Sequence, residues 1–259
     1  MDIKKSLANF YDAQAEKYAQ TRNKHRSDAD IFLNALQTYN KKTIRILEFG
    51  CGSGRLLSQL SQLKDIKINY TGIDISKNLL SFAKKQIPPK STHIKATFLC
   101  DDIVHAITTF PQESFDFVIG IASFQHIPTP KERFFLTKNI YRILDYQGKC
   151  IMTNRSFSSW FIGKYKKALC TALRKYIYSL GKYERNNILI PRKNGKTTSQ
   201  RFYHIYTLRE LKKLITMSGF IIENIGYIDN QGMIIPDWKI SKNSLVIASK
   251  SIFLQTEEN

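Results

Sequence analysis

One short stretch, residues 44–55, constrains the fold of this chain more than any other. Its first half, residues 44–49, is an apolar run of the kind that forms a parallel strand covered on both faces. Three alternate glycines follow, Gly50, Gly52 and Gly54, which allow a sharp turn and a close approach of a ligand to the backbone. Leucines at helical spacing come next. The stretch therefore predicts a strand, a glycine-rich turn and a helix of an α/β fold.

Two acidic residues indicate the kind of ligand that such a turn would bind. Glu48 stands two residues before the first glycine, so the motif is E-x-G-x-G-x-G and not the G-x-G-x-x-G of a dinucleotide site. A carboxylate there suits a ligand with a positive charge better than a pyrophosphate. Asp74 lies 20 residues after Gly54, at the end of a second predicted strand. A carboxylate in that place can accept hydrogen bonds from both hydroxyls of a ribose.

With these motifs the sequence resembles the class I S-adenosylmethionine-dependent methyltransferases. The resemblance implies a Rossmann-like, seven-stranded α/β sheet with helices on both faces and an antiparallel final strand, and S-adenosylmethionine as the cofactor. In that family the glycine segment holds the methionine part of the cofactor. An acid after the third strand bonds the adenine, and the next residue packs on the ring.

Asp102 and Ile103 match that third-strand pair best, with Asp101 as the alternative acid. The two adjacent acids could instead simply cap the next helix. The cofactor-binding set implied by the resemblance is Glu48, Gly50, Cys51, Gly52, Gly54, Asp74, Ile75, Asp101, Asp102 and Ile103.

The 259 residues are predicted to form a single methyltransferase domain. Residues 1–43 form an N-terminal helical cap, and residues 44–154 form the cofactor-binding core. Residues 155–206 are a basic, mostly helical insertion or lid, and residues 207–259 are a C-terminal helix and hairpin. A helix is expected over about residues 5–25, and its Y-D-x-x-A-x-x-Y pattern is similar to a family segment that packs over the cofactor.

The insertion carries most of the positive charge. The chain has a formal net charge of +19, and residues 155–201 contain 12 Lys and Arg against one acid. A basic amphipathic helix followed by a mobile cationic loop over residues 192–201 is predicted. The helix fits a lid, a membrane-surface helix or an RNA contact. The RNA-binding candidates are Lys164, Lys167, Arg174, Lys175, Arg192, Lys193 and Lys196.

The cysteines and the hydropathy exclude other classes of protein. The four cysteines are far apart and form no C-x-x-C pair, so neither a metal site nor a disulfide framework is predicted. No run approaches the ~18 apolar residues of a membrane span, and a cytoplasmic location is expected.

A second motif narrows the resemblance. Residues 201–206, Arg-Phe-Tyr-His-Ile-Tyr, are similar to the tRNA wobble-uridine carboxymethyl methyltransferases, which esterify 5-carboxymethyluridine at the anticodon. A carboxylate acceptor has a pKa of roughly 4 and needs no general base at neutral pH. Groups that position it are required instead, and Arg22, Arg201, Tyr203 and His204 are the candidates. The resemblance implies tRNA as a partner, and a small activator protein as a second one.

His126 follows the fourth predicted strand, at the edge of the sheet where α/β proteins bind ligands. It is a candidate for the pocket wall or, with another acceptor, for a general base. Two other functions stay open: a small-molecule O- or C-methyltransferase whose basic helix contacts a membrane, and a non-catalytic RNA-binding subunit.

Overall fold

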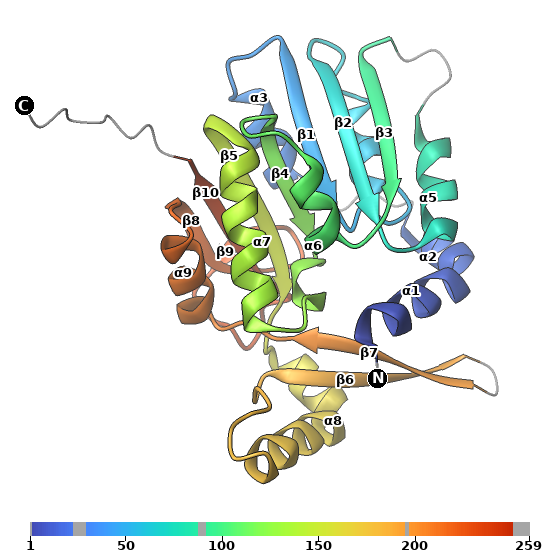
Figure 1. Ribbon diagram of the computed structural model, residues 1–259, viewed down its shortest axis with the longest axis vertical. Helices are drawn as coiled ribbons and strands as arrows, with labels where there is room; N and C mark the ends of the chain where they lie inside the picture. The colour runs from blue at the N-terminus through green and yellow to red at the C-terminus, as the bar shows by residue number, and fades with distance from the viewer. Residues whose placement is uncertain (1, 23–29, 88–91, 195–196, 251–259) are drawn as a thin grey trace, which may run out of the picture.

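A mostly parallel sheet forms the centre of the fold in the computed structural model, which describes residues 2–22, 30–87, 92–194 and 197–250 (Figure 1). Its strand order is β3-β2-β1-β4-β5-β10-β8-β9. The strands are β1 (Thr43–Phe49), β2 (Lys67–Asp74), β3 (Ile94–Cys100), β4 (Phe115–Ile121), β5 (Leu144–Arg155), β8 (Ile221–Ile228), β9 (Ile234–Ile235) and β10 (Asn243–Ser249). Strand β10 is antiparallel to both of its neighbours. The predicted fold class is confirmed, and the short β9 extends the predicted sheet at one edge.

Helices cover both faces of this sheet because its central strands are apolar on both sides. Ile44 and Ile46 of β1 pack into one core cluster, and Leu47 and Phe49 pack into the other. The first cluster is closed by α3 (Asp30–Gln37), α4 (Arg55–Leu60) and α5 (Lys77–Ala83). The second is closed by α6 (Ile103–Ala106), α7 (Pro130–Ile143) and α9 (Leu208–Met217).

The N-terminal cap begins with two helices where one was predicted. Helix α1 (Ile3–Ala13) is capped by the Asp2 side chain, and α2 (Ala15–Arg22) follows after a break at Gln14, whose backbone is not helical. Helix α1 lies beside the carboxyl ends of the parallel strands, toward which the arrowheads of β1 and β2 point (Figure 1).

The basic insertion is only half helical, which corrects the prediction. Helix α8 (Ser159–Tyr178) is followed by a separate two-stranded hairpin, β6 (Asn187–Asn194) and β7 (Thr197–His204). We call α8, β6 and β7 together the hairpin module. The described part of the predicted mobile loop forms the ends of both strands. The reason is a small core of its own, in which Phe161 and Ala172 of α8 pack with the hairpin residues Ile188 and Ile190.

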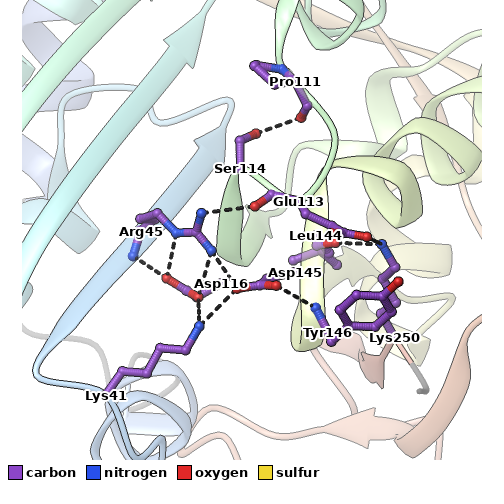
Figure 2. Close-up of polar contacts among 10 residues, drawn as sticks. All are labelled: Lys41, Arg45, Pro111, Glu113, Ser114, Asp116, Leu144, Asp145, Tyr146 and Lys250. Atoms are coloured by element: carbon purple, nitrogen blue, oxygen red, sulfur yellow. Dashed lines mark hydrogen bonds and ion pairs between the residues drawn. The ribbon is translucent and has the colours of Figure 1, made fainter.

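A dense polar network holds the opposite, amino-terminal ends of the strands (Figure 2). The Asp116 carboxylate on β4 accepts hydrogen bonds from Arg45 on β1 and from Lys41, at 2.7–3.1 Å. Asp145 accepts from the same two cations, at 2.9 Å from Lys41 and 2.7 Å from Arg45. Burial opposes ionisation of Asp116, but the bonds from Arg45 and Lys41 outweigh it, so the pKa of this carboxyl lies below its ordinary value.

Among the described helices, none combines the length and the apolar character that crossing a bilayer requires.

Candidate active site

A pocket opens at the carboxyl ends of β1, β2 and β4, with α1 and α2 as its cover. This is the edge at which open α/β sheets bind ligands. Nine of the ten predicted cofactor residues line it: Glu48, Gly50, Cys51, Gly52, Asp74, Ile75, Asp101, Asp102 and Ile103. The cover contributes Lys4, Leu7, Tyr11 and Tyr18, and the segment after β4 contributes Ser123 and His126.

The glycines of the turn serve different purposes. All three have φ between +57° and +78°, a region that side chains disfavour. A Cβ on Gly50 would lie 2.2 Å from Ser123 Oγ, whereas a Cβ on Gly52 would meet nothing within 4 Å. Gly52 therefore faces open space in the pocket. Gly54 does not line the pocket: a Cβ there would lie 2.8 Å from the Ala83 backbone, so this glycine lets α4 approach α5.

Glu48 is a buried carboxyl at the end of β1, with 3% of its surface exposed. The Tyr70 hydroxyl donates a hydrogen bond to it at 2.5 Å. Burial raises the pKa of Glu48 to about 8, although Tyr70 and the nearby charge of Arg55 act in the opposite direction. A cation brought to this carboxyl would restore its ionised form, so the site favours a positively charged ligand group.

Asp74 holds the glycine turn in place from the end of β2. One carboxylate oxygen accepts from the Gly52 amide at 2.8 Å, and the other accepts from the Ser76 amide at 2.9 Å. Ser76 caps α5 and also donates to Asp12 of α1 at 2.6 Å. The same few residues thus connect the turn, the second strand and the cover.

The two acids after β3 both line the pocket, and one of them is also a helix cap. Asp102 accepts from the Val104 amide at 3.0 Å, as the alternative prediction stated, and forms an ion pair with Lys4 of the cover at 3.0 Å. Asp101 accepts from the Asp102 amide at 2.7 Å and contacts His105 Nδ1 at 2.6 Å.

His126 forms part of the pocket wall. Its Nδ1 lies 2.7 Å from the Phe202 carbonyl oxygen, which can only accept, so Nδ1 carries a proton. In the neutral ring Nε2 then accepts from the Tyr11 hydroxyl, 3.0 Å away. The bond to β7 fixes the ring, and the bond to Tyr11 connects it to the cover.

Arg201 and Tyr203 lie behind this wall and are not among the residues that line the pocket. Arg201 Nη1 donates to the Tyr18 hydroxyl at 2.9 Å, and its guanidinium stacks on Phe10, 4.9 Å from the ring centroid. Arg201 is 9% exposed, and its buried Nε has no hydrogen-bond partner. The Tyr203 ring lies 4.7 Å from the ring of His126. The predicted role of these two residues in positioning a substrate therefore stays a prediction, and any such effect would be exerted through the residues that line the pocket.

His204 lies farther from the pocket and has a structural environment. Its two ring nitrogens lie 2.7 Å from Asn187 Oδ1 and 2.7 Å from Glu210 Oε1. Glu184, His204 and Glu210 offer atoms within 4.8 Å of one another, but Arg133 pairs with Glu184. His204 joins the hairpin to the start of α9, because it is bound from both sides within the protein.

The described RNA-binding candidates all lie on the exposed part of α8: Lys164, Lys167, Arg174 and Lys175. Lys167 and Lys175 line a groove between α8 and the hairpin, together with Tyr183 and Gln200. The side chains of Arg22, Arg192 and Lys193, and the whole of Lys196, lie outside the described part of the chain.

Lys4, Ser123 and Tyr70 are among the residues in or beside the pocket that the sequence predictions missed. Lys4 and Ser123 line the pocket, and Tyr70 bonds Glu48 from the neighbouring strand. Of these, only Tyr70 could have been predicted from the sequence, since a tyrosine in a buried strand needs a hydrogen-bond partner for its hydroxyl. The other two are ordinary surface and loop residues until the fold brings them to the pocket.

Known proteins share this arrangement. A family model described as a methyltransferase domain matches residues 46–148, the segment that carries the glycine turn, Asp74 and Asp102. The chain therefore contains a methyltransferase domain and is an S-adenosylmethionine-dependent methyltransferase in fold. The methyltransferase is 27% identical over 226 residues to the malonyl-[acyl-carrier protein] O-methyltransferase of Bacillus cereus, an alignment that covers 86% of this chain and 74% of that one.

Solved structures agree on the fold. An S-adenosylmethionine-dependent methyltransferase from Methanosarcina mazei matches 84% of this methyltransferase and 97% of its own chain, with a TM-score of 0.63 and 22% identity. A complex of the Haloferax volcanii Trm112 methyltransferase activator with a methyltransferase contains a chain that matches 93% of this one and 97% of its own length, with a TM-score of 0.60 and 14% identity.

Proposed function

We propose that this methyltransferase transfers the methyl group to a carboxylate that is presented on a large anionic carrier. The carboxymethyl group of a tRNA wobble uridine is the first candidate acceptor. The observation that carries the proposal is the buried guanidinium of Arg201 behind the pocket wall.

Arg201 gives the acceptor end of the pocket a positive charge. Burial by itself lowers the pKa of a guanidinium, but Tyr203, Tyr11 and Tyr18 beside it raise the pKa of Arg201 overall. These neighbours are tyrosines, and within the described residues no carboxylate forms an ion pair with Arg201. A buried cation without a paired anion is costly, and an anionic ligand nearby would reduce that cost. A carboxylate acceptor meets this requirement, whereas a neutral phenol or amine does not.

The tyrosines transmit this preference into the pocket, where Tyr11 and Tyr18 are part of the lining. A hydroxyl that accepts a hydrogen bond from a guanidinium is a stronger donor for its own proton. The Tyr18 hydroxyl has such a bond from Arg201. Arg201 is therefore proposed as a positioning residue, and Tyr18 as the group that would contact the acceptor.

The other pocket residues fit S-adenosylmethionine, whose sulfonium supplies the methyl group when it is bound. The buried Glu48 suits the cationic methionine end, and the open space at Gly52 leaves room for it. Asp74 is proposed for the ribose, and Asp102 with Ile103 for the adenine. The acceptor carboxylate is already ionised at neutral pH, so the chain has to orient it and exclude water, and no general base is required.

The positive charge of the hairpin module supports a large anionic carrier for the acceptor carboxylate. Lys167 and Lys175 of its groove suit the phosphates of an RNA. A malonyl thioester on an acyl carrier protein is the second candidate, favoured by the likeness to the Bacillus cereus enzyme over most of the chain. Its acceptor is a carboxylate too, so the chemistry of the pocket is the same for both. A small activator protein remains a proposed partner, supported by the Haloferax volcanii complex.

The test is transfer of labelled methyl from S-adenosylmethionine to bulk tRNA and, separately, to malonyl-acyl carrier protein. Label that enters one acceptor and is released by mild alkali indicates a methyl ester. Arg201→Met should lower kcat/KM for that acceptor by about 100-fold, the effect of losing one preorganised polar contribution, while the Kd for the cofactor stays within about threefold. Arg209→Met removes an exposed arginine and is the matched control.

Alkali-stable label would contradict the carboxylate proposal, as would an unchanged kcat/KM in Arg201→Met. Arg201→Lys keeps the charge and should recover part of the activity, which separates the electrostatic effect from a loss of folding. Melting temperatures of all three variants complete the comparison.

A further inference from the structure

The outer side of α8 has a surface that the proposed function does not use. The inner side of the helix packs on the hairpin through Phe161 and Ala172, which are 1% and 3% exposed. In Figure 1 the helix lies at the far edge of the module, away from the large sheet. The outer side of α8 is therefore exposed on the surface of the protein.

An apolar ridge follows this outer side. Cys170, Leu173 and Ile177 are spaced by three or four residues, so they lie on one side of the helix, and Leu180 follows just beyond its end. Leu173 is 46% exposed, Ile177 is 58% exposed and Leu180 is 91% exposed. Single exposed aliphatic side chains are common on protein surfaces, but a continuous ridge of them marks a contact surface.

Cations and aromatic residues flank the ridge. Residues 159–185 contain seven Lys and Arg and one acid, Glu184, which pairs with Arg133. Lys166 precedes Cys170 by one helical turn and extends the ridge with a positive charge. Trp160 and Tyr178, near the two ends of the helix, are 59% and 85% exposed.

We propose that this ridge docks on the surface of an anionic lipid bilayer. A helix that lies in the interface places its apolar side at the boundary between headgroups and acyl chains, and its cations at the lipid phosphates. Trp and Tyr favour that same depth. An RNA would pair with the cations and stack on the aromatic rings, but it offers no partner for Leu173, Ile177 and Leu180. The groove that holds Lys167 and Lys175 is a separate surface, between α8 and the hairpin.

The experiment is co-sedimentation of the full chain with phosphatidylcholine vesicles, with and without phosphatidylglycerol. Binding to the anionic vesicles alone is expected, and it should weaken as salt is added because the cations contribute. The double variant Leu173→Asn/Ile177→Asn should reduce the partition coefficient by about tenfold or more, since two apolar side chains no longer insert. Lys166→Glu should reduce it by about fivefold.

Lys212→Glu is the matched control for charge, because Lys212 is exposed on α9 and outside the module. It should leave vesicle binding within twofold. Melting temperatures and binding of S-adenosylmethionine in the absence of vesicles show that the ridge variants are folded.

Three results would overturn the proposal. They are equal binding to neutral and anionic vesicles, no binding to either, and a loss of tRNA affinity or of a self-association in the Leu173→Asn/Ile177→Asn variant. The outcome is independent of the carboxylate proposal, which Arg201 variants test in solution.

Discussion

The two ends of β1 differ in how the buried carboxyl groups beside them are paired. Arg45 near the start of the strand forms a network with Asp116, Lys41 and Asp145, in which every acid has a cation (Figure 2). Glu48, three residues later, has a tyrosine hydroxyl as its hydrogen-bond donor and forms no ion pair within the described residues. The pKa of Asp116 is lowered and that of Glu48 is raised. At one end of the sheet the acids are paired with cations, and at the other the buried Glu48 carboxyl is proposed to pair with a cationic ligand.

This difference separates residues that maintain the fold from residues that bind. A satisfied network gains nothing from a further ion, so the amino-terminal end is unsuited to a charged ligand. A protonated buried carboxyl costs stability each time it ionises, and a bound cation removes that cost. Substitutions of Glu48 and of Asp116, and the pH dependence of stability, test this separation.

Glu48→Gln should have the largest effect, and it should be on binding. The amide keeps the shape of the side chain but cannot carry the charge that is proposed to face the cationic end of S-adenosylmethionine. The Kd for the cofactor should rise by about 30-fold to 1,000-fold, as when one partner of a buried charge pair is removed. Isothermal titration calorimetry measures this. The melting temperature should not fall, because the amide oxygen of the substituted side chain still accepts from the Tyr70 hydroxyl.

The control is Glu223→Gln, which removes a carboxylate at the surface of β8, paired with Lys149. Its Kd should stay within twofold of the parent. A Glu48→Gln protein that binds the cofactor normally but melts earlier would reverse the assignment of this end of the strand.

Asp116→Asn should instead reduce stability and leave cofactor affinity unchanged. It leaves Arg45 and Lys41 with one carboxylate fewer, and because both cations are a third or more exposed, the cost should be about 2 kcal/mol. Asp145→Asn removes the more exposed acid of the same network and should cost less than about 1 kcal/mol. Urea unfolding of both variants measures the difference. Equal costs would mean that burial of Asp116 contributes nothing.

The sequence predicted the binding end of the sheet better than the polar network at the other end, because the residues of the binding motif are close together in the sequence. The apolar run, the glycines and Asp74 lie within 31 residues, from Ile44 to Asp74, and they predicted the first two strands and part of the pocket lining. The Arg45–Asp116 network joins residues 71 apart, and nothing in either segment indicated the pairing.

The hairpin module shows the other limit of sequence reasoning. Its cationic segment was interpreted as a loop, because charge and Gly195 dominate it. The strands form because Ile188 and Ile190 alternate toward α8, a helix that must be in place before they have anything to cover. The environment of His204 could not be predicted for a related reason, since its partners Asn187 and Glu210 belong to different elements.

The last expected difference is in pH dependence. The pKa of Glu48 is raised from 4.5 to about 8, so its contribution to stability is fully present below pH 4.5 and is lost as the pH rises toward 8. Asp116 has a lowered pKa, so its contribution is present above its ordinary value of 3.8 and is lost as the pH falls through the lowered one.

The free energy of unfolding of the cofactor-free protein, measured by urea titration, should therefore decline between pH 5 and pH 8. The contribution of Glu48 to this decline is at most about 1.4 kcal/mol per pH unit. Glu48→Gln should remove that decline, whereas Asp116→Asn should keep it. A decline that persists in Glu48→Gln would assign the titration to another group.

Strand β7 belongs to the small sheet, yet its Phe202 carbonyl fixes His126 and its Arg201 holds Tyr18 of the cover. One strand is thus shared by two parts of the protein that look separable in the ribbon (Figure 1). The module cannot be exchanged for that of a relative as a self-contained cassette, since a graft would replace the back of the pocket as well. Chimeras cut on either side of β7 would inherit a change in acceptor preference along with the new surface.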